Sequence, residues 1–283
     1  MKCFKRTLAY DLKHGIWEKK GGYFVTALLA VFLFTDYSIK LRNYYGNGMA
    51  GNPDVTMADY LLYFFSGRYP YMEGEQVFLI PITWLLIFLC SSLLVLNYPM
   101  QNLCGHGIQV LIRIRDRKLW WLSKCGYVLC STVLYYFILY AVTFVLCLIS
   151  GVRLSAGYSE SAMENILNFT FQTPPEKTGL LVQLLFMPVL VSLAVNLLQL
   201  GLSLLLDRIY AFMLAAVLLL LSTYIQVCWL PGVYAMVMRS SWVMEEGVLW
   251  KQGILVAGIY MIVSVTAGMV RIRRFDILKK EAE

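Results

Sequence analysis

Long runs of apolar residues, separated by short polar connections, dominate the sequence. Six runs stand out, at residues 23–39, 77–96, 119–150, 180–206, 209–230 and 253–270. A helix needs roughly 20 apolar residues to cross a hydrocarbon core about 30 Å thick. The runs are apolar on every side and do not alternate at every second position, which excludes the strands of a membrane barrel. The pattern predicts an all-α integral membrane protein with six transmembrane helices in a single domain, residues 1–283.

Three connecting segments have amphipathic or turn-forming patterns of their own. Residues 4–17 place Phe4, Leu8, Leu12 and Ile16 at every fourth position, which predicts a helix lying flat on the inner membrane surface. Residues 56–59 match a capping box that opens a short aromatic helix over 60–65, expected at the outer membrane interface. Residues 231–252 begin with a Pro-Gly breaker and stay semi-apolar, which predicts short re-entrant helices in the outer leaflet.

Composition agrees with a lipid environment. Hydrophobic residues make up 59% of the chain and charged residues only 14%, whereas a soluble domain is typically about a quarter charged. Too few polar side chains remain to cover a water-facing surface.

The distribution of Lys and Arg predicts the orientation. Of the 24 basic residues, 17 fall in residues 1–22, 97–124, 207–208 and 271–283. Because cytoplasmic connections carry the excess of basic residues, both termini are expected in the cytoplasm and the chain in the cell membrane. The net charge of +7 follows from this bias, so we expect no nucleic-acid partner.

Several chemistries have no basis in the sequence. It contains no Gly-x-x-x-x-Gly-Lys-Ser/Thr phosphate loop, and its two histidines, His14 and His106, are far apart. None of the seven cysteines forms a Cys-x-x-Cys pair. We therefore predict no catalytic residue, no metal site and no cofactor in this chain. An intramembrane enzyme would need histidines or carboxylates deep in the runs; no run has a histidine, and Asp36 lies only at the end of the first run.

The order of elements resembles one known family. Residues 115–124, Arg-Asp-Arg-Lys-Leu-Trp-Trp-Leu-Ser-Lys, are similar to a run in type-2 ABC exporter permeases. Those six-span proteins also have an interfacial helix before the first span, a cytoplasmic coupling helix between spans two and three, a tight turn between spans four and five, and re-entrant helices before span six. The outer connection 40–76 is longer than in the simplest members.

The resemblance implies partners and sites. ATP and Mg would be bound by separate ABC ATPase subunits, and a second permease subunit, identical or different, would complete the transporter within the membrane lipid. The segment that couples to the ATPase would include Met100, Gln101, Leu103, Gly105 and Ile108. A solvated basic loop that only fixes topology is the alternative for this segment. Spans two and five would line the pathway, with the polar residues Thr83, Ser91, Ser222, Thr223 and Gln226; helix packing is the alternative role for each of these.

Three functions stay open at this point. The first is an ABC export permease that moves a peptide, an antibiotic or a lipid-like molecule outward. The second is a non-transporting sensor or immunity subunit on the same scaffold, which perceives a ligand through residues 40–76. The third is an intramembrane enzyme, which the missing histidines and carboxylates disfavour.

Overall fold

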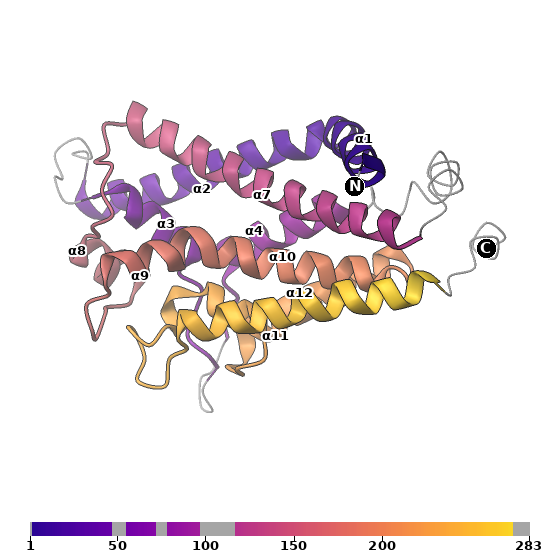
Figure 1. The fold of residues 1–283 in the computed structure, drawn as a ribbon. Helices are drawn as coiled ribbons and strands as arrows, with labels where there is room; N and C mark the ends of the chain where they lie inside the picture. Colours follow the sequence, from indigo (N-terminus) through magenta and orange to yellow (C-terminus); the bar gives the residue numbers. More distant parts are fainter. Residues whose placement is uncertain (1, 47–54, 72–77, 97–116, 274–283) are drawn as a thin grey trace.

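The protein is a bundle of helices, as the sequence predicts (Figure 1). The computed structural model describes residues 2–46, 55–71, 78–96 and 117–273, and within these ranges there is no β-strand. In chain order the helices are α1 (Lys2–Glu18), α2 (Lys20–Tyr45), α3 (Met57–Phe65), α4 (Ile82–Leu96), α7 (Arg117–Ile149), α8 (Glu160–Ala162), η3 (Met163–Leu167), α9 (Lys177–Leu181), η4 (Val182–Phe186), α10 (Met187–Leu202), α11 (Arg208–Tyr224), η5 (Pro231–Ala235), η6 (Val237–Arg239) and α12 (Trp250–Arg273).

Each predicted apolar run contains a helix, but the helices differ in length. Four of them are long and apolar enough to cross a membrane: α2, α7, the continuous helix Lys177–Leu202 and α12. The helices α4 and α11 are apolar but have only 15 and 17 residues. At 1.5 Å per residue they extend about 22 and 26 Å, less than the hydrocarbon thickness. The fold is therefore that of a helical membrane protein with four long helices and two short ones.

Several helix ends differ from the predicted boundaries. The helix in run 77–96 begins only after Pro81, and the helix in run 209–230 ends at Tyr224. The predicted two-residue turn at 207–208 is longer, because α10 already ends at Leu202. In the opposite sense, α2 continues past residue 39 to Tyr45. Its end is supported by an ion pair at i,i+4 spacing, Asp36 to Lys40 at 2.9 Å.

The helix α10 occupies the centre of the bundle. It contacts α4, α7, α11 and α12. Of the apolar window in Lys177–Leu202, 67% is buried, against 22% for α12. The remaining long helices present rows of exposed apolar side chains, such as Phe24, Phe32, Phe137 and Leu255, as expected for helices that face lipid.

The two ends of the bundle are built differently (Figure 1). At one end lie α1, the start of α7 and the last turn of α12; we call this the terminal end. At the opposite end lie α3, α8 and α9, and we call this the loop end. The spans α2 and α7 run side by side between them.

The predicted N-terminal helix forms, but its buried face differs from the prediction. The apolar stripe that includes Leu8 and Leu12 is only half-buried, whereas Thr7, Asp11 and Gly15 are buried. The helix packs on α7, where a Cβ atom at Gly126 would lie 2.9 Å from Leu8 Cδ1. The stripe therefore borders a protein contact, and the sequence pattern alone did not show it.

The capping box at residues 56–59 is confirmed. The Thr56 backbone N–H donates to Asp59 Oδ2 at 2.8 Å, and the short helix α3 follows. Its aromatic side chains, from Tyr60 to Phe65, are all buried within the protein, and its predicted place at the outer membrane interface stays a prediction. They pack against α2, where Tyr60 stacks on Phe34 with ring centroids 4.5 Å apart.

Candidate functional site

The connection between α11 and α12 is folded into the bundle. Every residue from 231 to 240 is buried, and we call this segment the plug. It consists of the two short 3-10 helices η5 and η6, and η5 contacts α10, α11 and α12. The predicted short helices before the last span are thus present, and they are enclosed by protein.

One buried cation organises the plug. The Arg239 side chain is fully buried and donates to three backbone carbonyls: Arg68 O at 3.0 Å, Ile225 O at 2.7 Å and Thr223 O. Burial lowers the pKa of Arg239 to about 10, which leaves it protonated at neutral pH. Two of the carbonyls belong to the end of α11, where unpaired carbonyls and the helix dipole favour a positive charge. Arg239 therefore caps α11.

The plug is also hydrogen-bonded to α4 and to η4. The Trp84 indole N–H donates to Ala235 O at 3.2 Å, and Gln183 Nε2 donates to Tyr234 O at 2.7 Å. A Cβ atom at Gly232 would lie 2.6 Å from Ser222 Cβ, so only glycine allows this close approach to α11. The short helices α4 and α11 thus meet a protein segment at the loop end.

A second polar cluster joins three helices in the middle of the bundle. The fully buried Asn196 of α10 donates to Ser91 Oγ at 3.1 Å and to Thr132 Oγ1 at 2.9 Å, and it accepts from Ser92 Oγ at 3.0 Å. Nearby, the Tyr136 and Ser192 hydroxyls lie 2.6 Å apart. Burying a polar group costs free energy unless it is hydrogen-bonded. These hydrogen bonds therefore fix α4, α7 and α10 relative to one another.

At the loop end, one carboxylate connects two loops. The fully buried Asp59 accepts from the backbone N–H of Thr56 and, at 2.9 Å, from that of Ser159. Burial raises the pKa of Asp59 to about 6, although these hydrogen bonds oppose the rise. The Thr56 hydroxyl donates to Gly157 O at 2.5 Å. Residues 157–159 are therefore attached to the start of α3.

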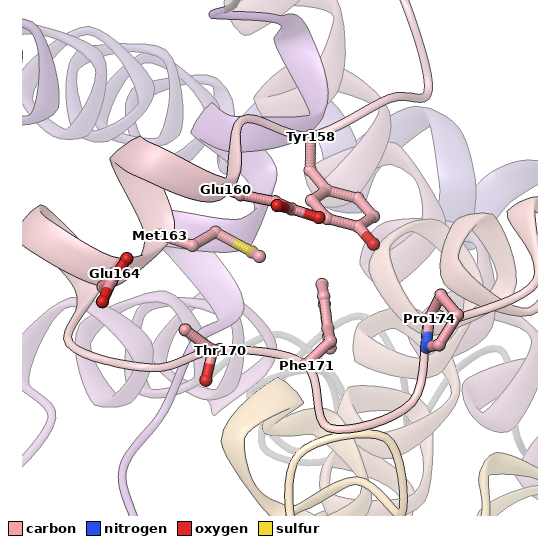
Figure 2. A pocket seen from close by; sticks show the side chains of 7 residues that line it. All are labelled: Tyr158, Glu160, Met163, Glu164, Thr170, Phe171 and Pro174. Atoms are coloured by element: carbon pink, nitrogen blue, oxygen red, sulfur yellow. The ribbon is translucent and has the colours of Figure 1, made fainter.

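A pocket of about 310 Å³ lies directly beyond this attachment (Figure 2). Its wall comes from α8, η3 and the loop that follows. The Phe171 ring and the Met163 side chain point into the hollow, and the Glu160 side chain lies toward the Tyr158 ring. The lining residues are Tyr158, Glu160, Met163, Glu164, Thr170, Phe171 and Pro174. Two of these seven are acidic, two are aromatic, and none is basic.

At the terminal end, an ion pair attaches α1 to α7. Lys124 Nζ lies 2.7 Å from Asp11 Oδ1, and Ser123 Oγ donates to Asp11 Oδ2 at 2.6 Å. Both charged side chains are almost completely buried. The sequence assigned Lys124 to the cytoplasmic basic residues and gave Asp11 no role, because nothing in their spacing shows that they meet.

The five predicted pathway residues do not form one site. Ser91 belongs to the Asn196 cluster. Ser222 and Thr223 donate to carbonyls of their own helix, at 2.8 and 2.7 Å. Thr83 is half-buried at the start of α4, and Gln226 Nε2 donates to Glu246 O at 2.8 Å. The predicted coupling residues Met100, Gln101, Leu103, Gly105 and Ile108 lie outside the described residues.

Sequence reasoning missed most of the residues that organise these sites. Arg239 lies outside the basic segments that predicted the topology, and the acidic and aromatic residues of the pocket are scattered over residues 158–174. Only Asp59 had a signal, the capping box. Among the described residues, no group of three or more His, Cys, Asp or Glu side chains is placed to hold a metal ion.

Comparison with known proteins gives a family without an assigned activity. A protein-family model described as "Protein of unknown function (DUF2705)" matches residues 55–278. No curated protein and no solved structure matches the chain.

Proposed function

The chain belongs to the DUF2705 family of proteins of unknown function, and we propose that this member is the transmembrane permease subunit of an ABC exporter. In this proposal all six apolar helices cross the cell membrane, with both termini in the cytoplasm. The subunit moves a peptide, an antibiotic or a lipid-like molecule outward. ATP is hydrolysed, with Mg, by separate ABC ATPase subunits, and a second permease subunit completes the pathway.

The observation that carries the proposal is the plug. In the family that the chain resembles, re-entrant helices precede the last span, and spans two and five, here α4 and α11, line the pathway. Residues 231–240 are a buried connection between the last two helices, and they meet both short helices, α4 and α11, through Trp84 and Arg239. Irregular backbone at membrane depth is tolerated only where protein or a water-filled cavity surrounds it, and the plug meets this condition.

The arrangement of the ends agrees with the proposed topology. The helix α1 and the last turn of α12 lie at the same end of the bundle (Figure 1), as an even number of crossings requires. The terminal end holds Arg271 and Arg273 in the last turn of α12 and Lys5, Arg6 and Lys13 on α1. This grouping of basic residues fits a cytoplasmic side.

Association with an ATPase tests the proposal. Burying a leucine side chain in an interface contributes about 1.5–3 kcal/mol, and each 1.4 kcal/mol is tenfold in affinity. We expect Leu103→Asp to reduce co-purification of the native ATPase by about one to two powers of ten. Leu103→Met conserves side-chain volume and should retain it. Absence of any ATPase in the purified wild-type complex would contradict the proposal.

A sensor or immunity subunit on the same scaffold is the second candidate. The pocket at the loop end favours it, since a receptor needs a ligand site and does not need a route through the bundle. Transport separates the two functions. ATP-driven movement of a substrate by vesicles containing the permease and its ATPase is expected for an exporter, and ATP-dependent signalling without movement is expected for a sensor.

A further inference from the structure

We propose that the pocket between Tyr158 and Pro174 is a binding site for an organic cation, such as a quaternary ammonium group attached to a small apolar body. The loop end of the protein would then recognise a small organic cation. Binding of the cation would not depend on ATP hydrolysis or on a partner subunit. This proposal can therefore be tested independently of the proposed export function.

The charge of the pocket contrasts with that of the chain. The protein carries a net charge of +7, yet the described residues that line the pocket include two carboxylates and no basic side chain. Glu160 and Glu164 are both exposed; the Glu160 side chain lies toward the Tyr158 ring, and the Glu164 side chain lies at the outer edge of the pocket (Figure 2). A local excess of negative charge attracts cations and disfavours anions.

The walls of the pocket select among cations. Tyr158 and Phe171 form an edge-to-face pair with ring centroids 4.9 Å apart, and Phe169 packs behind Phe171 at 5.7 Å. The Met163 side chain points into the same space (Figure 2). Aromatic faces attract a weakly hydrated cation by cation–π interaction. A hard metal ion would instead need six or more oxygen ligands, which aromatic rings and a thioether do not supply.

The attachment of the loop keeps the pocket formed. Asp59 holds the Ser159 backbone N–H at 2.9 Å, directly between Tyr158 and Glu160. The Ser159 side chain also caps α8 by accepting from the Ala162 N–H. The two residues that offer an aromatic face and a carboxylate are therefore fixed on either side of one anchored residue. The volume of about 310 Å³ lies at the small end of the range for ligand pockets, which suits a small cation.

Binding of choline to the purified full-length protein tests the proposal. Titration calorimetry should show saturable binding in the millimolar range or tighter. The uncharged isostere of choline, with carbon in place of the quaternary nitrogen, should bind about tenfold more weakly or worse, since cation–π and charge interactions are lost. This comparison uses wild-type protein alone and needs no variant to fold.

Matched variants locate the site. The double change Glu160→Gln and Glu164→Gln should weaken choline binding about tenfold or more, and Phe171→Leu should weaken it as well. Glu176→Gln removes the same charge from an exposed residue of the same loop that does not line the pocket, and it should leave binding unchanged. No saturable binding of choline, equal binding of the isostere, or full binding by the double variant would each overturn the proposal. None of these results would bear on association with an ATPase.

Discussion

Asp59 and Arg239 are both fully buried, and among the described residues neither charge is compensated by an ion pair. Arg239 donates to three carbonyls, two of them at the end of a helix, so the backbone supplies the negative end of the interaction. Asp59 accepts from two backbone N–H groups. Burial still outweighs these two bonds and raises the pKa of Asp59 to about 6. The charge of Asp59 therefore changes at mildly acidic pH.

The raised pKa of Asp59 predicts that the stability of the folded protein depends on pH. The pKa of Asp59 is about 6 in the folded protein and 3.8 as its ordinary value, so the folded state binds more protons between these limits. The free energy of unfolding should then fall by at most about 3 kcal/mol as the pH rises from 4 to 6. Asp59→Asn should lack this fall, which thermal unfolding of both proteins across the range will measure.

Two features keep this test specific to Asp59. The neighbouring phenol of Tyr60 stays neutral in this range, because burial raises its pKa to about 12. The variant Glu160→Gln removes an exposed carboxylate close by in the same loop, and its profile should follow that of the wild type. If Asp59→Asn kept the full fall in stability between pH 4 and 6, another group would be responsible.

At the scale of elements, the contact of α1 with α7 depends on small and charged residues. The ion pair of Asp11 with Lys124 and the close approach at Gly126 occur within one turn of α7. A buried Lys whose partner is lost costs several kcal/mol, so α1 is held in place although its apolar stripe is only half-buried. The start of α7, at Arg117, comes after the segment that we propose binds the ATPase.

Enlarging Gly126 should displace α1. In Gly126→Leu the side chain would occupy the space of Leu8, which lies 2.9 Å from a Cβ atom at this position. We expect faster hydrogen exchange of the α1 amides while the other helices keep their protection. The control is Gly258→Leu on α12, where a Cβ atom meets nothing within 4 Å. Unchanged exchange in Gly126→Leu would show that α1 is held by other contacts.

The sequence predicts elements better than it predicts how they meet. Apolar runs located all six apolar helices, and the capping box located α3, because both depend on local patterns. The burial of the α3 aromatics and the meeting of Asp11 with Lys124 depend on residues more than 20 and 110 positions apart. Arg239 has partners 171 and 14 positions away. No local pattern contains such contacts, so the pocket and the plug could not be predicted.

At the scale of the whole molecule, the basic residues at the terminal end predict that this end lies on the cytoplasmic side of the membrane. Single cysteines should be introduced by Thr173→Cys at the loop end and by Lys13→Cys on α1, both exposed positions, in a protein without its seven native cysteines. A membrane-impermeant thiol reagent should label the first in intact cells. The second should react only after the membrane is opened.

The opposite pattern of labelling would reverse the topology and place the pocket in the cytoplasm. Labelling of both positions in intact cells would mean that the terminal and loop ends do not lie on opposite sides. Either result would remove the basis for a cytoplasmic ATPase partner at the terminal end.

The position of Arg239 in the chain also affects the order of biogenesis. All three carbonyls that it caps come from earlier residues, 68, 223 and 225, and α12 comes after it. The chain is synthesised from its N-terminus, so α4 and α11 emerge before residues 231–240, which cover their ends. Two backbone carbonyls at the end of α11 then lack the cap, and a chain cut before residue 239 would never gain it. Formation of the helices and completion of the bundle are therefore separate events, and the second requires the last sixth of the chain.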